Sequence, residues 1–243
     1  MLLHPGQGGL VLWDPQFVEF ARSHRVVRYD ARGFGRSERP DREFAHWEDL
    51  LALLDALDMD RAALVGLSLG GRTAIDFALA YPDRVRALVL ANPGISGYQF
   101  TGLERYFADI KAATEGNDVA AFVEIQLRMW VDGPTRLPAQ VDPAIRERVR
   151  HVLTEQAERN RARGNAPRFN ELNAVTRLSE IRAPTLVVES ALDQPDAHDV
   201  CALLARSIPG ARRLVIDGAA HLVNLERPAA FAAAVLPFIA RQG

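Results

Sequence analysis

Ala-Ala-Leu-Val-Gly-Leu-Ser-Leu-Gly-Gly, residues 62–71, joins an apolar, strand-like run to a helical pattern that continues to Tyr81. Within it, Gly66, Ser68 and Gly70 form the pattern G-x-S-x-G, which between a strand and a helix holds a nucleophilic serine on a sharp turn. A side chain at either glycine would collide with the crossing strand or helix. The stretch therefore predicts a nucleophile at Ser68; the alternative is a glycine-rich turn that only closes a strand–helix unit.

Strand and helix patterns alternate on both sides of this turn. Short apolar runs predict strands at 26–29, 62–67, 86–91, 184–189 and 212–216, and helical patterns occupy 13–24, 44–57, 69–81, 197–207 and 228–241. The runs are too continuous for burial on one face only, which favours parallel strands with helices over both faces. The expected fold is a mostly parallel α/β sheet flanked by helices.

One long segment interrupts the alternation. Residues 94–181 show no strand pattern and predict helices at 104–115, 119–131 and 144–163. We interpret this segment as a helical cap over the carboxyl edge of the sheet, inserted into a core formed by residues 1–93 and 182–243.

The expected cap contains the candidates for substrate binding. Its apolar side chains could line the pocket or pack the cap onto the sheet; they are Phe107, Phe122, Met129 and Trp130. Arg128 could bind a substrate carboxylate, or it could belong to a solvated helix face.

A serine hydroxyl needs a base, and the base needs a third group that holds it. His221 follows the strand expected at 212–216 after a short loop, so it lies at the carboxyl end of a strand, where open α/β sheets bind ligands. The alternative for His221 is a loop residue beside a helix start. The sequence thus favours His221 as the base.

The acid is expected directly after the preceding strand. Asp193 is the first carboxylate beyond the strand expected at 184–189. Asp196 is the reserve candidate, although its place after Pro195 suits the first turn of a helix. The predicted catalytic set is Ser68, Asp193 and His221, in that chain order.

From residue 4 to the C-terminus, the chain resembles the α/β-hydrolase superfamily and is most similar to small bacterial esterases, including the 3-oxoadipate enol-lactonase type. The resemblance rests on residues 30–37, the serine turn, residues 192–196, residues 218–221 and the order of the triad. It implies a serine hydrolase that cleaves a small carboxylic ester or lactone through an acyl-enzyme, without a cofactor.

The resemblance also implies an oxyanion hole. The N–H of Leu69 would provide one donor, and the loop after the first strand would provide the other. That loop reads His-Pro-Gly-Gln-Gly-Gly at residues 4–9, so the second donor is Gly6 or Gln7. Pro5 has no N–H to donate, and His4 is expected to orient the loop.

The start of the chain departs from the family pattern. Members of the superfamily have two further strands before the oxyanion loop, whereas this sequence has only Met1-Leu2-Leu3 there. The usual first two strands are therefore expected to be missing, through a truncated sequence or a smaller sheet. A smaller sheet would expose the apolar run at 26–29 as an edge, which favours association. A monomer or a homodimer is consistent with this pattern.

Composition excludes several classes of function. The chain has 243 residues, a net charge of −2 and one cysteine, Cys201. This charge balance predicts no nucleic-acid partner, and one cysteine permits neither an internal disulfide nor a cysteine-based metal centre. No metal is expected. No apolar run reaches the roughly twenty residues of a membrane helix, and no secretory signal is present, so we expect a cytoplasmic protein without a membrane partner.

Three alternatives to ester or lactone hydrolysis remain open at this point. The same triad could hydrolyse a C–C bond, or it could form a peracid. A receptor-like member of the superfamily would bind a small ligand with negligible turnover. Serine at the nucleophile position argues against dehalogenase and epoxide hydrolase chemistry, which proceeds through an aspartyl ester.

Overall fold

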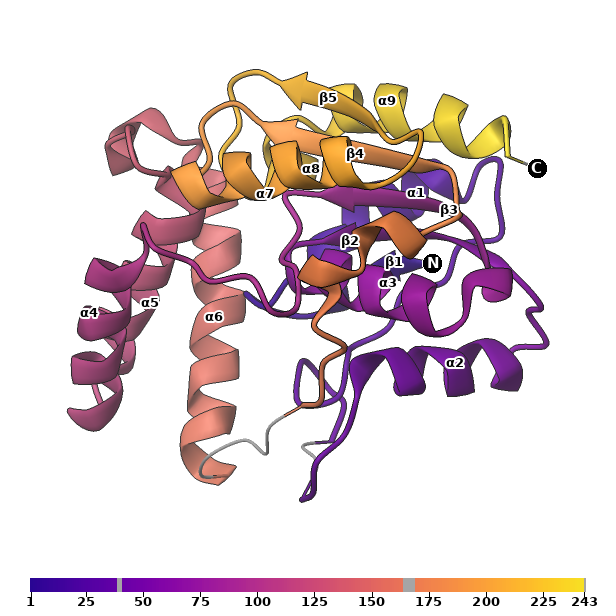
Figure 1. Ribbon diagram of the computed structural model, residues 1–243. Coiled ribbons are helices and arrows are strands. Elements are labelled where there is room, and N and C mark those ends of the chain that lie inside the picture. The colour runs from indigo at the N-terminus through magenta and orange to yellow at the C-terminus, as the bar shows by residue number, and fades with distance from the viewer. Residues whose placement is uncertain (39–40, 164–168, 243) are drawn as a thin grey trace.

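Five parallel strands form one sheet, as the computed structural model of residues 1–38, 41–163 and 169–242 shows (Figure 1). Their spatial order follows the chain: β1 (Leu2–Leu3), β2 (Ala62–Leu67), β3 (Val85–Ala91), β4 (Thr185–Ser190) and β5 (Arg212–Ile216). All four neighbouring pairs are parallel. The predicted parallel α/β fold is confirmed, and β2 and β5 have the predicted bounds.

The strand expected at residues 26–29 is not formed. This segment makes a single isolated bridge, between Leu2 and Arg28, and Leu2 donates its N–H to the Val27 carbonyl at 2.8 Å. The physical reason lies in its partner, because β1 has only two residues and Pro5 follows without an N–H. A ladder extends no further than both of its strands allow.

The strand β5 also differs from expectation. Burial on both faces was predicted, yet its first four residues, Arg212–Val215, are exposed. The strand lies at the edge of the sheet and pairs only with β4 among the described strands. The apolar residues Leu214–Ile216 predict a strand, but they do not show whether helices cover that strand.

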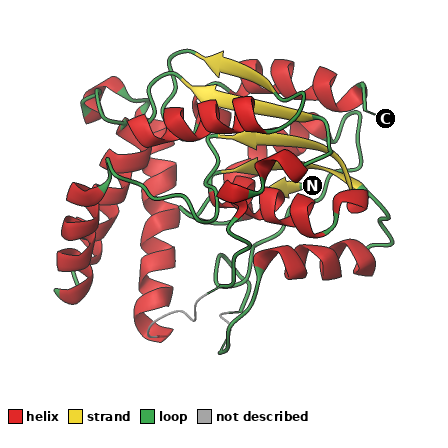
Figure 2. Cartoon of the chain, viewed as in Figure 1, coloured by secondary structure: helices red, strands yellow, loops and turns green. Residues whose placement is uncertain are grey.

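Helices cover both faces of the sheet (Figure 2). The α-helices are α1 (Asp14–Phe20), α2 (His46–Ala56), α3 (Leu69–Ala80), α4 (Glu104–Glu115), α5 (Val119–Leu127), α6 (Pro143–Arg163), α7 (Pro195–Ser207), α8 (Val223–Glu226) and α9 (Pro228–Ala240). Short 3₁₀ segments lie at Leu10–Trp13, Pro82–Arg84, Pro138–Gln140, Ala174–Thr176 and Leu178–Glu180.

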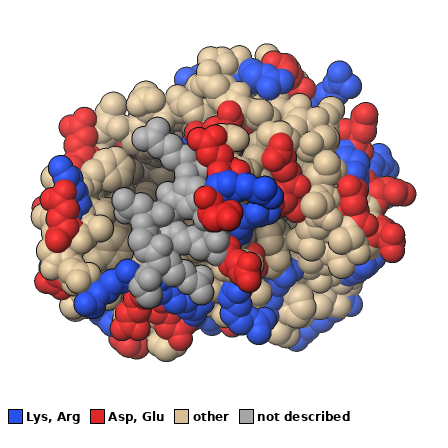
Figure 3. All heavy atoms as spheres, turned by 90° about the horizontal axis from the view of Figure 1, so that it is seen from below, with Lys and Arg blue, Asp and Glu red and all other residues tan. Residues whose placement is uncertain are grey.

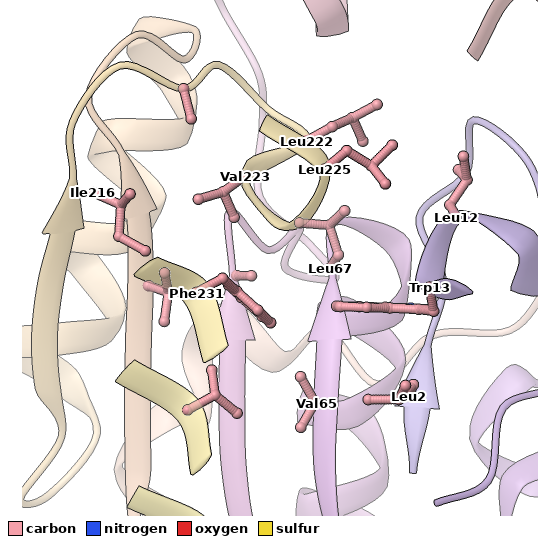
Figure 4. Close-up of a cluster of buried hydrophobic side chains, with 14 of the residues drawn as sticks. Leu2, Leu12, Trp13, Val65, Leu67, Ile216, Leu222, Val223, Leu225 and Phe231 are labelled. Atoms are coloured by element: carbon pink, nitrogen blue, oxygen red, sulfur yellow. The ribbon is translucent and has the colours of Figure 1, made fainter. Parts of the chain in front are cut away.

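One face of the sheet packs against α1 and α9. Val65 and Leu67 of β2 point to this side, where Trp13 and Phe231 lie with ring centroids 5.8 Å apart (Figure 4). Leu222, which follows His221, belongs to the same buried cluster. The loop that carries the predicted base is therefore anchored in the hydrophobic core.

The opposite face packs against α2, α3 and α7. Leu64 of β2 points to this side, as the two-residue period of a strand requires, and contributes to a second buried cluster. Leu54 of α2, Phe77 of α3 and Leu204 of α7 complete the layer. Because apolar residues of β2 are buried on both faces, the run reads as continuous hydrophobicity.

The helices of the expected cap, α4 to α6, lie beyond the carboxyl ends of the strands (Figure 1). The helix expected at 119–131 is α-helical only to Leu127 and continues as a π-helix, Arg128–Asp132. A π-turn widens the helix by one residue, which changes the direction of every later side chain.

The distribution of surface charge and the hydrophobicity of the helices bear on possible partners. Acidic and basic side chains are interspersed on the face of the molecule shown in Figure 3. None of the helices within the described residues combines the length and hydrophobicity that crossing a bilayer requires.

Candidate active site

Ser68 lies on a strained turn between β2 and α3. Its backbone has φ 53° and ψ −113°, a conformation that non-glycine residues rarely adopt. A Cβ atom on Gly66 would lie 2.4 Å from the Gly70 carbonyl oxygen, and one on Gly70 would lie 2.1 Å from the Leu3 carbonyl oxygen. Both glycines are therefore required by close backbone approach, which is the geometry of a nucleophile elbow.

His221 and Asp193 form a buried pair. His221 Nδ1 lies 2.7 Å from Asp193 Oδ2, and the other carboxylate oxygen, Oδ1, accepts the N–H of Gln194 at 2.7 Å. His221 Nε2 is buried and has no hydrogen-bond partner among the described residues. The pairing orients the imidazole and leaves one ring nitrogen available within the site.

Backbone contacts and one amide side chain hold the two loops together. The Leu192 N–H donates to the Ala219 carbonyl at 2.9 Å, which joins the loop of Asp193 to the loop of His221. Asn92, just after β3, donates from Nδ2 to the His221 carbonyl at 2.8 Å and to Ser190 Oγ at 2.7 Å. The loop that carries His221 is thus tied to two neighbouring strands.

Ser68 and His221 line the same small pocket, with a volume of about 30 Å³. The ring of Trp130 lies against the His221 imidazole, with centroids 4.3 Å apart and planes tilted by 39°. The described lining residues are Ser68, Asn92, Pro93, Gly94, Phe100, Leu103, Trp130, Gln194, Asp196, Ala197 and His221. The pocket has room for about one or two water molecules.

The loop at residues 4–9 lies beside the start of α3. A Cβ atom on Gly6 would lie 3.9 Å from Leu69 Cβ, so this loop adjoins the first N–H groups of the helix. The Nδ1 atom of His4 lies 2.8 Å from the Pro5 carbonyl, and its Nε2 accepts the Ala31 N–H at 2.9 Å. Burial lowers the pKa of His4, which favours the neutral ring that these contacts need.

The other predicted pocket residues lie elsewhere. Met129 is buried, Phe122 packs on the hydrophobic core, and Phe107 is 48% exposed on α4. The Arg128 side chain is 64% exposed and lies near Glu124. None of these four described residues lines the pocket with Ser68, whereas Trp130 does. Propensity places residues on a helix, but the packing of the helix decides which face meets the sheet.

Asp196, the reserve acid, serves a different contact. Its carboxylate accepts the N–H groups of Thr101 at 3.2 Å and Gly102 at 2.7 Å. It therefore joins the start of α7 to the segment before α4, while Asp193 pairs with His221.

Several pocket residues carry no sequence motif. Phe100 and Leu103 precede α4 and reach the pocket only through the path of the chain after β3. Asn92 directly follows β3, and Gln194 adjoins Asp193 in the loop after β4. Their positions at the carboxyl ends of strands are the sequence signal that could have identified both as pocket residues. Among the described residues, no group of three His, Cys, Asp or Glu side chains is arranged to hold a metal ion.

Comparison with known proteins agrees with this geometry. The model of the alpha/beta hydrolase fold family matches residues 1–228. The 2-hydroxymuconate semialdehyde hydrolase of Pseudomonas sp. (strain CF600) is 30% identical over 254 residues, covering 99% of this chain and 86% of that protein.

Two solved structures are also similar over almost the whole chain. A hydrolase from Pseudomonas aeruginosa PA01 is 34% identical with a TM-score of 0.79, covering 98% of this chain and 88% of that one. The enol-lactonase from Burkholderia xenovorans LB400 is 28% identical with a TM-score of 0.77, covering 98% and 90%. The resemblance to the superfamily is confirmed, and the chain belongs to the α/β-hydrolase fold family.

Proposed function

We propose that this protein is a serine hydrolase that cleaves a small carboxylic ester or a lactone. Ser68 is the nucleophile, His221 the general base and Asp193 the acid that orients it. One observation carries the proposal: the 2.7 Å contact between Asp193 Oδ2 and His221 Nδ1, in a site whose pocket is lined by Ser68. The strained backbone of Ser68 supports the same assignment.

The protonation states follow from the contacts. When Nδ1 donates to the Asp193 carboxylate, Nε2 carries a lone pair and can accept the Ser68 proton. The serine oxygen then attacks the carbonyl carbon, and Asp193 stabilises the imidazolium that forms. His221 returns the proton to the leaving oxygen. Water activated by the same nitrogen afterwards releases the acid from the acyl-enzyme.

The negative charge that develops on the carbonyl oxygen needs donors in place. The Leu69 N–H is among the first four of α3, which have no partner within the helix, and lies at the positive end of the helix dipole. We assign the second donor to Gly6, whose loop adjoins Leu69, with Gln7 as the alternative. Removing one such donor typically lowers kcat by about 10² to 10³.

The bond cleaved is the finer part of the proposal. The likeness to the enol-lactonase of Burkholderia xenovorans LB400 favours a lactone or ester. The 30% identity with a 2-hydroxymuconate semialdehyde hydrolase supports a second candidate, cleavage of a C–C bond by the same triad. Comparison of p-nitrophenyl esters, lactones and 2-hydroxymuconate semialdehyde as substrates distinguishes the two.

We expect Ser68→Ala to lower hydrolysis of the preferred substrate by at least about 10³ without unfolding the protein, because no other group replaces the attacking oxygen. Steady-state kinetics measure the loss, and a fluorophosphonate probe should label the unchanged chain at Ser68. Ser23→Ala is the matched control. Ser23 Oγ also lies 2.8 Å from a histidine, His24, but on the exposed surface.

The control variant should keep full activity and full labelling. More than a few per cent of the activity left in Ser68→Ala would refute the assignment of the nucleophile. A folded chain that neither reacts with the probe nor turns over any substrate of the panel would instead support a ligand-binding protein.

A further inference from the structure

Trp130, which lies over the His221 imidazole, is carried by a π-helix. The π-helix Arg128–Asp132 extends α5 and places the centroid of the indole ring 4.3 Å from the centroid of the imidazole. Trp130, His221 and Ser68 are three of the residues that line the pocket of about 30 Å³. Whatever holds this π-helix therefore positions one wall of the pocket.

Arg136 binds the end of the π-helix. Its Nη2 donates to the Val131 carbonyl at 2.6 Å, and its Nε donates to the Asp132 carbonyl at 2.9 Å. Carbonyls at the end of a helix have no partner within it, so a guanidinium that takes two of them fixes that end.

The same guanidinium also reaches the loop of His221. Arg136 Nη1 lies 2.6 Å from Glu226 Oε2, and Glu226 Oε1 accepts the N–H of Ala220 at 2.8 Å. Ala220 directly precedes His221. One arginine and one glutamate thus connect the helix that carries Trp130 to the loop that carries the base.

Burial makes this connection rigid. The side chains of Arg136 and Glu226 are only 12% and 5% exposed. Loss of either partner would leave the other charge buried without its counterion, so alternative positions of the π-helix are disfavoured. The loop of Asp193 adds a third attachment, because Gln194 Nε2 donates to the Met129 carbonyl at 2.7 Å.

We propose that Arg136 and Glu226 are positioning residues that hold Trp130 over His221 and thereby restrict the acyl part of the substrate to short chains. The inference rests on the proposed hydrolase function and names its substrate class. Trp130 sets the length limit, and the ion pair keeps Trp130 in place.

The test compares p-nitrophenyl acetate with p-nitrophenyl hexanoate. We expect Arg136→Met to raise the ratio of kcat/KM for hexanoate over acetate about tenfold, the scale on which an apolar pocket discriminates chain length. The rise should disappear in the Trp130→Ala background, because the pair acts through that ring. Glu226→Gln should also raise the ratio, and this variant replaces Arg136→Met in the test if Arg136→Met does not fold.

Arg150→Met is the matched control. Arg150 also lies on a cap helix and pairs with a glutamate, Glu124 at 3.1 Å, but it binds neither of the two π-helix carbonyls that Arg136 holds. The ratio of kcat/KM for hexanoate over acetate in Arg150→Met should equal that of the unchanged chain. A ratio unchanged in folded Arg136→Met and Glu226→Gln, or raised equally when Trp130 is already alanine, would overturn the proposal.

A second measurement is independent of turnover. The fluorescence of Trp130, obtained by subtracting the spectrum of the Trp130→Phe variant, should become more accessible to acrylamide in Arg136→Met than in the unchanged chain. Equal accessibility would contradict the positioning role. Failure of fluorophosphonate labelling at Ser68 would instead contradict the proposed function, so the two failures are distinguishable.

Discussion

Ser68 stands apart among the residues with a left-handed backbone. Of the non-glycine residues that the structure describes, Asp58, Asn92, Asn117 and Asn173 share a positive φ with it. Aspartate and asparagine tolerate this region because their short polar side chains bond locally, whereas serine has no such preference. The surrounding packing maintains the strained backbone of Ser68.

The carboxylates of Asp193 and Asp196 contact different groups, so we expect different roles for them. We expect Asp193→Asn to lower kcat by about 10⁴, because an amide neither selects the required tautomer of His221 nor stabilises its charge. Asp196→Asn is the control: its partners are the N–H groups of Thr101 and Gly102, so its kcat should stay within about tenfold of the unchanged chain. Stopped-flow or steady-state rates measure both. A larger loss from Asp196→Asn than from Asp193→Asn would reverse the assignment of the acid.

The contact between α3 and β1 depends on the absence of a side chain at Gly70. We expect Gly70→Ala to destabilise the protein by about 3 kcal/mol, because the added methyl would lie 2.1 Å from the backbone oxygen of Leu3. Gly94→Ala is the control, since its nearest atoms, in Arg72, are an ordinary 3.6 Å away. Urea denaturation measures both free energies of unfolding. Equal stabilities of the two variants would contradict the close approach.

The elements that the sequence predicts best are those set by local pattern. The bounds of β2, β5 and α4 coincide with the predicted ranges, because continuous apolar runs and helical periodicity are local properties. The run at 26–29 has the same local pattern but no partner of sufficient length, so it forms one bridge.

The candidate site divides in the same way. The contact between Asp193 and His221 could be predicted because each follows a strand, and parallel strands bring their carboxyl ends to one edge. Whether Phe107 and Phe122 line the pocket or pack elsewhere could not be predicted, because the face that a helix turns toward the sheet depends on tertiary packing. The π-turn before Gly133, which aims Trp130, has no signal in the sequence pattern.

Acid should weaken the whole fold through His46. This histidine lies buried between Phe44 and Phe169, with ring centroids 4.9 and 5.0 Å away. Burial lowers its pKa to about 4, from an ordinary value near 6.5. Below pH 6.5 the unfolded chain therefore binds a proton that the folded chain does not.

Stability should consequently be complete above about pH 6.5 and fall as the pH approaches 4, with His46 contributing roughly 3 kcal/mol of the loss. His46→Phe keeps an aromatic ring without a titrating group, so its stability should depend less steeply on pH in this window. Urea denaturation at several pH values measures the difference. Parallel pH profiles for the two chains would contradict the buried, neutral state of His46.

The contact between Trp13 and Phe231 joins segments more than two hundred residues apart, and it has a consequence for synthesis. While the ribosome is still adding α9, one face of the sheet lacks part of its cover, and the buried cluster that contains Leu222, the residue after His221, is incomplete. Long-range closure of this kind is slow and leaves sticky surface exposed in the nascent chain. The contact between Asp193 and His221 should therefore form late in folding, and molecular chaperones would protect the exposed apolar surface until then.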